Sequence, residues 1–179
     1  ASTTQGLVTA LFDLIEQHEI DAAKVRKVRV GMSKVGNDMH STFPRYKGKF
    51  EALLSAHYAV AAVLHDRELT LTQFEPRRYE DAKLRSFAAE QVEVREDASL
   101  TGTQTIVEAE LADGRTVKVR SDVPRGSPEK PLTRAQIEAK FRTYAKGRMS
   151  AARIDEVVTT VSRLETLASV RTLMDLLRC

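Results

Sequence analysis

Hydrophobic and polar residues follow two clear periods near the start of the chain. Apolar residues first recur at helical spacing, and Ser2 and Gln5 stand at the distance of a capping box, which predicts a helix over residues 3–18. The segment VRKVRVGMSK then alternates, which predicts a half-buried strand over residues 25–34. Its expected inward side chains are Val28, Val30 and Met32.

The middle of the chain is predicted to be mainly helical. Residues 34–47 have no period and contain Gly, Asn, Asp and Pro, so we expect a long loop, which in a compact domain is often functional. A continuous helix is predicted over residues 48–65. At 3.6 residues per turn, at most one of two neighbouring side chains can lie centrally on its buried face. Thr72 is expected to cap the next segment, and a short helix follows over residues 82–90.

The last part of the chain returns to alternation and then to helices. Residues 92–97 and 105–121 read as strands, with Asp113-Gly114 as the turn of a β-hairpin. Thr133 and Gln136 form a second capping box. The helices expected after it cover residues 133–146, 150–164 and 168–177.

This order of elements predicts an α+β fold rather than an alternating doubly wound sheet. We expect an antiparallel sheet with packed helices, followed by a C-terminal helical tail.

Composition and charge exclude several classes of protein. The 179 residues are 42% hydrophobic and 30% charged, as in an ordinary soluble globular protein. No apolar run approaches the roughly 20 residues that span a bilayer, so no membrane partner is expected. The net charge of +3 is spread along the chain, and the basic segments KVRKVR and PRR resemble solvated faces, so no nucleic acid is expected. The single cysteine, Cys179, fits a reducing cytoplasm.

Motifs for cofactors are absent from the sequence. The four histidines stand at unrelated spacings and only one cysteine is present, so we expect no metal. The eight glycines form no phosphate-binding loop, and Ser55 does not have the context of a nucleophile elbow.

The segment LSAHYAVAAVLHD places a polar pair, His57 and Tyr58, in an otherwise apolar helix. Tyr58 could pack its ring in the core and donate its hydroxyl to a main-chain carbonyl or water. Alternatively, it could present a protonated phenol to a pocket. The residues alone leave both interpretations open.

Several ordered segments resemble one known family. FEALLSAHYAVAAVLHD resembles the middle lid helix of the MmgE/PrpD family, with Ala52, Ser55, Tyr58, Val60 and Ala61 at matching places. The segments LADGRTVKVRSDVPRGSPEKPLTRAQIEAKFRTYA and VSRLETLASVRTLMDLL resemble the hairpin, loop and last helices of that family. The similarity runs in order over about residues 48–179.

The resemblance implies lyase or isomerase chemistry on small dicarboxylic or tricarboxylic acids, without a metal or organic cofactor. The family includes 2-methylcitrate dehydratase, cis-aconitate decarboxylase and an iminodisuccinate epimerase. Its fold is a large helical domain plus a smaller α+β lid, with the active site between them, and its members are typically homodimers.

By the same resemblance, residues 1–130 form the lid, and residues 131–179 are a helical tail that packs on an N-terminal helical domain. That domain is absent from this sequence, which begins at Ala1 and corresponds to a C-terminal part. The family's lid histidine falls at or before the first residues, where this chain has none. We therefore expect the 179-residue chain alone to be inactive.

The resemblance also implies site residues. Tyr58 matches the active-site tyrosine of the family. His57 is either a substrate-tuning position or a solvent-facing residue. The helix start from Ser2 to Gln5 could offer N–H groups to a substrate carboxylate, and Lys34 could steer an anion. The substrate-binding candidates are thus His57, Ser2, Thr3, Thr4, Gln5 and Lys34.

A second interpretation belongs to another class of protein. The lid fold alone could be a non-catalytic interaction or structural module that binds a partner protein through apolar surface. An in-frame helical domain upstream would favour the enzyme, and a start codon directly before Ala1 would favour the module.

Overall fold

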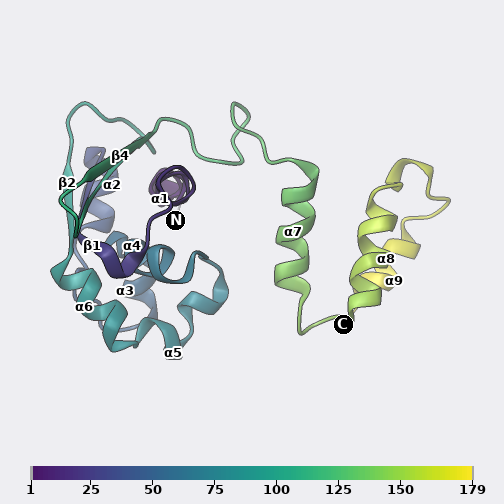
Figure 1. The fold of residues 1–179 in the computed structure, drawn as a ribbon. Helices are drawn as coiled ribbons and strands as arrows, with labels where there is room; N and C mark the ends of the chain where they lie inside the picture. Colours follow the sequence, from purple (N-terminus) through teal and green to yellow (C-terminus); the bar gives the residue numbers. More distant parts are fainter. Residues whose placement is uncertain (1, 179) are drawn as a thin grey trace. The chain divides into compact units, whose positions relative to one another are not determined.

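The computed structural model describes residues 2–178, so Ala1 and Cys179 lie outside the described residues. The chain divides into two compact units, which join in sequence between Lys130 and Pro131 (Figure 1). The fold class is α+β, as predicted, and helices follow in the C-terminal segment. No helix within residues 2–178 combines the length and apolar character needed to cross a bilayer.

The first unit contains a four-stranded mixed sheet in the order β2-β1-β3-β4. Its strands are β1 (Val25–Met32), β2 (Val92–Glu96), β3 (Thr105–Leu111) and β4 (Thr116–Ser121). The pairs β1–β3 and β3–β4 are antiparallel, as expected, but β1 and β2 run parallel. A parallel pair requires a crossover, and here the helical segment between the two strands supplies it.

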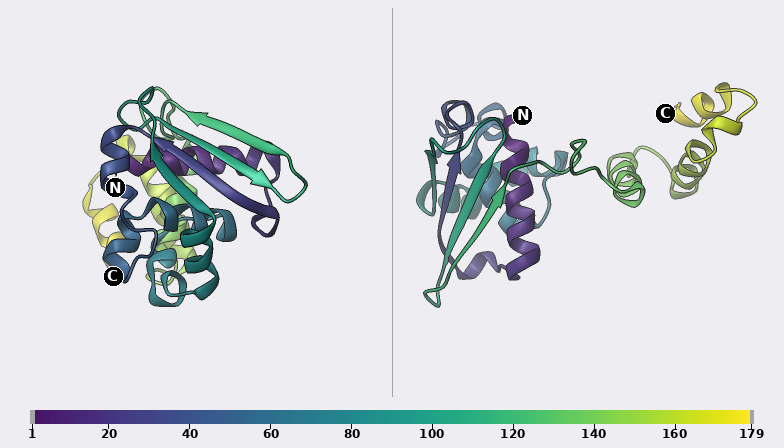
Figure 2. Two further views of the ribbon diagram at one scale, coloured as in Figure 1. Left: turned by 90° about the vertical axis from the view of Figure 1, so that its left-hand side faces the viewer. Right: turned by 90° about the horizontal axis from the view of Figure 1, so that it is seen from above.

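One face of the sheet is apolar and covered. The predicted alternation in β1 is confirmed, with Val28, Val30 and Met32 fully buried beside Val107 and Val119 of the neighbouring strands. The helices that contact the sheet include α1 (Gln5–His18), α2 (Lys34–His40), α4 (Ala56–Asp66) and α6 (Ala82–Glu90), and α1 runs along its covered face (Figure 2).

The opposite face carries paired charges. Lys27 contacts Glu93 at 2.8 Å, and Arg29 contacts Glu108 at 3.1 Å and Glu110 at 3.4 Å. Two basic residues of the segment KVRKVR, Lys27 and Arg29, therefore face acidic cross-strand neighbours.

The start of α1 differs from the prediction. A 3-10 turn, η1 (Ser2–Thr4), precedes the helix, and Thr4 rather than Ser2 occupies the N-cap position. Thr4 has helical backbone angles (φ −92°, ψ −4°), so its side chain makes no capping hydrogen bond. The capping box predicted for Ser2 and Gln5 is therefore wrong.

The predicted long loop contains a helix, α2 (Lys34–His40). The Ser33 hydroxyl accepts a hydrogen bond from the Gly36 N–H at 3.3 Å and starts this helix. Only Gly36 and His40 of α2 are buried, and this is too few for a visible apolar period. Irregular chain continues from Ser41 to Gly48.

The helix predicted over residues 48–65 is divided at Ser55 into α3 (Lys49–Leu54) and α4. Ser55 is extended (φ −81°, ψ 113°) and caps α4 by accepting a hydrogen bond from the Tyr58 N–H at 3.0 Å. The next turn, η3 (Leu71–Phe74), has Thr70 as its N-cap instead of Thr72. A short helix, α5 (Pro76–Tyr79), lies between it and α6.

The second unit consists of helices, and its predicted capping box at Thr133 and Gln136 is confirmed. The elements are α7 (Arg134–Ala145), α8 (Ala151–Val161), the 3-10 turn η4 (Leu164–Thr166) and α9 (Arg171–Leu177). Within this unit a groove of about 640 Å³ is mainly apolar. Its apolar lining residues are Ile137, Phe141, Val157, Val158, Val161 and Leu177.

Candidate functional site

The junction between α3 and α4 determines where the polar pair His57 and Tyr58 lies. Ser55 is buried, and its hydroxyl donates to the Phe43 main-chain oxygen at 2.7 Å while it caps α4. Helix α4 is buried on every side from Ala56 to Leu64, so His57 and Tyr58 are both in the interior. The expectation that only one of them could be central is wrong, because α4 has neighbours on more than one face.

Tyr58 is fully buried in an aromatic cluster. Its ring lies edge-on to Tyr46 at 4.9 Å and to Phe74 at 5.7 Å between ring centroids. Its hydroxyl donates to the main-chain oxygen of Gln73. Burial raises the pKa of Tyr58 above its usual value, so the phenol is protonated at neutral pH. This is the geometry of the core interpretation, and the catalytic assignment of Tyr58 stays a prediction.

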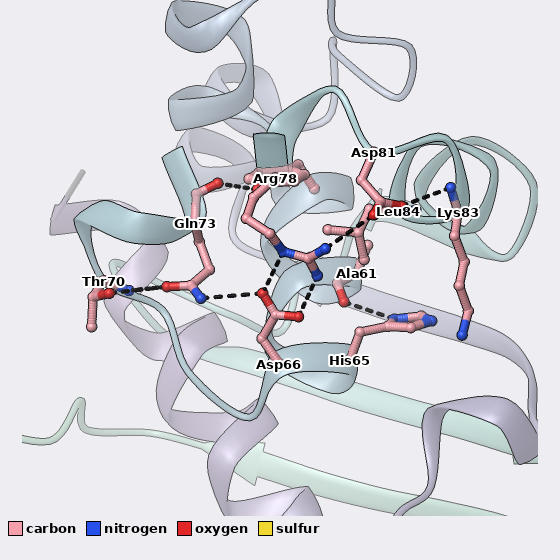
Figure 3. Close-up of polar contacts among 10 residues, drawn as sticks. Ala61, His65, Asp66, Thr70, Gln73, Arg78, Asp81, Lys83 and Leu84 are labelled. Carbon is pink, nitrogen blue, oxygen red and sulfur yellow. Dashed lines mark hydrogen bonds and ion pairs between the residues drawn. The ribbon is translucent and has the colours of Figure 1, made fainter. Parts of the chain in front are cut away.

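A polar network fixes the acceptor of Tyr58 (Figure 3). The Gln73 amide donates to Asp66 at 3.1 Å, and its oxygen accepts from the Thr70 N–H at 2.9 Å. Arg78 donates to Asp66 through two nitrogens and to Asp81 at 3.0 Å. Arg78 lies between the two carboxylates, and this arrangement holds η3 and α5 against the end of α4.

His57 is only 5% exposed, so the alternative that it faces solvent is wrong. Its Nδ1 is buried and has no hydrogen-bond partner among the described residues. Burial lowers the pKa of His57 to about 4, and the ring is therefore neutral at pH 7. A role in tuning a substrate stays a prediction.

The structure brings the N-terminal polar segment to a histidine that the sequence analysis did not select. Thr3 Oγ1 lies 2.6 Å from His40 Nε2, and His40 Nδ1 lies 2.8 Å from the main-chain oxygen of Leu54. His40 is fully buried, and burial lowers its pKa, although the bond to Leu54 opposes the change. Leu54, whose main-chain oxygen contacts His40, directly precedes Ser55, which caps the helix that carries Tyr58.

The other residues selected in the sequence analysis lie outside the Tyr58 cluster. Ser2 and Gln5 are exposed beside Thr3 at the start of α1. Lys34 is exposed and donates to Asp38 at 2.8 Å, and this hydrogen bond raises the pKa of the lysine. No hydrogen bond within residues 2–178 joins Thr3 or Lys34 to Tyr58.

His40 could not be selected from the sequence because its partners are distant or belong to the main chain. Thr3 lies 37 positions away, and Leu54 contributes only a carbonyl. The signal for His40 in the sequence was that this histidine lies in a segment without an apolar period. Across the described part of the chain, no group of three or more His, Cys, Asp or Glu residues is placed to hold a metal ion.

Comparison with protein families gives a match over most of the chain. Residues 2–164 match the family model described as the MmgE/PrpD C-terminal domain. The chain therefore belongs to the MmgE/PrpD family, as its C-terminal domain, which confirms the resemblance found in the sequence. A comparison with curated proteins found no match.

Proposed function

We propose that the chain is the C-terminal part of a cofactor-independent lyase or isomerase that acts on small dicarboxylic or tricarboxylic acids, with dehydration like that of 2-methylcitrate dehydratase as the leading reaction. The observation that carries this proposal is the family match over residues 2–164. Related decarboxylation or epimerisation would need the same kind of site.

The chemistry begins with loss of a proton or of CO2 beside a carboxylate. Negative charge then grows on that carboxylate, and donors that are already in place stabilise the charge. The 14-residue helix α1 begins next to Thr3, which contacts His40, and the N–H groups of its first turn have the polarity that a carboxylate requires. His40, neutral and fixed by Leu54, can accept a proton through Thr3.

Tyr58 can act on a substrate only if its hydroxyl changes its hydrogen-bond partner. Its hydroxyl now donates to the Gln73 oxygen, so donation to a substrate requires that this bond be exchanged. The network of Asp66 and Arg78 opposes such movement because it holds Gln73 against α4.

The second unit has a proposed structural role. We propose that its apolar groove packs on a helical domain of the same protein and that the complete enzyme is a cytoplasmic homodimer. The groove and the exposed Ile137 and Val161 support this role, because large exposed apolar patches usually mark interfaces.

The product of the whole gene and the 179-residue chain should be assayed side by side on 2-methylcitrate, citrate and cis-aconitate. We expect turnover of at least one acid by the whole product and none by the 179-residue chain, since residues that act as a group lose their effect when separated. Absence of both turnover and binding in the whole product would refute the proposal.

The groove also favours a second candidate, a non-catalytic interaction module. That candidate predicts that the whole gene product is short and binds none of the three acids. Sizing chromatography of the 179-residue chain examines the groove itself. A monomer that binds no hydrophobic dye would argue against an interface at this surface.

A further inference from the structure

A small cavity in the first unit has two arginines in its wall. The cavity has a volume of about 250 Å³ and is lined by residues 44–46 and by α6, with Arg45 and Arg85 among its lining residues. Three other arginines of the unit each contact two carboxylates: Arg29, Arg78 and Arg125. Within residues 2–178, no ion pair joins Arg45 or Arg85 to a carboxylate. Two positive charges therefore share this cavity without an ion-pair partner among the described residues.

Arg85 is held in place from two sides. Its Nε donates to the main-chain oxygen of Tyr79 at 3.2 Å, and its guanidinium carbon lies 5.6 Å from the centre of the Tyr46 ring. Burial raises the pKa of Tyr46 to about 12, although Arg85 opposes the change, so the phenol is neutral at pH 7 and does not neutralise the arginine. A guanidinium group fixed in this way loses little freedom when its terminal nitrogens bind an oxyanion.

A negative charge stands further along the same helix. Glu90 is the last residue of α6 and also lines the cavity. The carbonyl groups at the end of a helix favour a cation, as the carboxylate of Glu90 does. Arg85 and Glu90 are five positions apart, which is about 7.5 Å along the helix axis. The cavity thus presents positive charge at the middle of α6 and negative charge at its end.

We propose that this cavity binds a small phosphate monoester that carries an ammonium group, with the phosphate at Arg45 and Arg85 and the ammonium at Glu90. A phosphate monoester has a charge of about −1.5 to −2 at pH 7 and three acceptor oxygens, so both arginines can donate to it at once. Pockets for drug-sized ligands measure about 300–1,000 Å³, and this smaller cavity suits a smaller molecule. None of the substrate-binding candidates lines it, so the proposal does not depend on the proposed function.

The experiment measures dissociation constants for the 179-residue chain by NMR titration at low ionic strength, where salt screens exposed charges least. The ligands are phosphoethanolamine, methyl phosphate, which lacks the ammonium group, and glycerophosphoethanolamine, which is the diester present in a lipid headgroup. Because Glu90 is exposed, we expect phosphoethanolamine to bind about 2- to 5-fold more tightly than methyl phosphate. The diester has one negative charge fewer and should bind more weakly than phosphoethanolamine.

Four variants separate the charges of the cavity from the charge of the whole chain. Arg85→Gln, at a half-buried position, should weaken both monoesters about 10-fold. Arg45→Gln, at an exposed position, should weaken them about 2- to 5-fold, and it keeps the test valid where Arg85→Gln does not fold. Glu90→Gln should remove the preference for phosphoethanolamine. Arg95→Gln, an exposed change in β2 outside the cavity, is the matched control and should bind like the wild type.

The absence of phosphate binding by the wild type, or equal losses in Arg45→Gln and Arg95→Gln, would overturn the proposal. Tighter binding of the diester would indicate a lipid headgroup and would also overturn it. A preference for phosphoethanolamine that survives in Glu90→Gln would overturn the role of Glu90. These results leave the proposed function unaffected, because no carboxylic acid is used in the titrations.

Discussion

The Tyr58 hydroxyl in α4 donates a hydrogen bond to the main-chain oxygen of Gln73, which lies 15 residues later in η3. This contact links the most deeply buried aromatic side chain to a turn that a charged network holds in place. It also gives the hydroxyl a partner inside the protein. Removing the hydroxyl therefore distinguishes a structural role from a catalytic one.

Tyr58→Phe leaves the Gln73 oxygen without its donor, and we expect a loss of about 1–3 kcal/mol in the free energy of unfolding. For a chain of this size, thermal denaturation should show a melting temperature lower by roughly 2–4 °C per kcal/mol. Tyr144→Phe, at an exposed position, is the control and should change little. An unchanged melting temperature together with a 10²–10³-fold loss of kcat in the whole gene product would instead place the hydroxyl at the substrate.

Parts of the fold with a strong local signal could be predicted from the sequence. The alternation in β1 and the Asp113-Gly114 turn, where Gly114 has φ 86°, depend on neighbouring residues only. The break at Ser55 could not be predicted, because a distant carbonyl of Phe43 holds the serine side chain. Likewise, the apolar period of α4 indicates one buried face, and only tertiary packing buries the others.

The candidate site was predictable to a similar extent. Thr3 and Tyr58 could be selected from the sequence, but His40 could not. The contact that draws attention to His40 is with Thr3, which lies 37 positions away in the chain. It also could not show that the Tyr58 hydroxyl has a main-chain partner.

Asp66→Asn is expected to weaken the network that holds η3 and α5. The change removes the charge that Arg78 contacts through two nitrogens, with side chains that are 16% and 26% exposed. Since hydrogen bonds to charged groups contribute about 1.5–3 kcal/mol each, we expect a loss of about 2–3 kcal/mol in urea denaturation. Glu75→Gln breaks the exposed pair with Arg77 and should cost less than about 0.5 kcal/mol. Equal effects of the two changes would contradict the stabilising role of the network.

Gly6→Ala is expected to disturb the contact between α1 and the chain before β3. A Cβ atom at Gly6 would lie 1.7 Å from the Thr103 main-chain oxygen, so the backbone must move. Overpacking of this kind costs about 1–3 kcal/mol or more and outweighs the better helix propensity of alanine, which contributes about 0.5–1 kcal/mol. Gly48→Ala is the matched control, because nothing lies within 4 Å of its Cβ position. A melting temperature for Gly6→Ala equal to that of the control would show that the contact is not tight.

The last prediction concerns the buried ring of His57. Its pKa is about 4 in the folded chain against an ordinary value of 6.5, so the unfolded chain binds the proton more readily between these values. Stability must therefore fall as the pH drops from about 6.5 to 4, by about 3 kcal/mol from this group, and His40 contributes in the same direction.

His57→Leu removes the titrating group and the unpartnered Nδ1, so it should equal the wild type at pH 7 and exceed its stability by about 2 kcal/mol near pH 4.5. His18→Gln, a histidine change at an exposed position, is the control. Urea denaturation at a series of pH values measures the slopes, and a wild-type slope in His57→Leu would show that other groups cause the loss in acid.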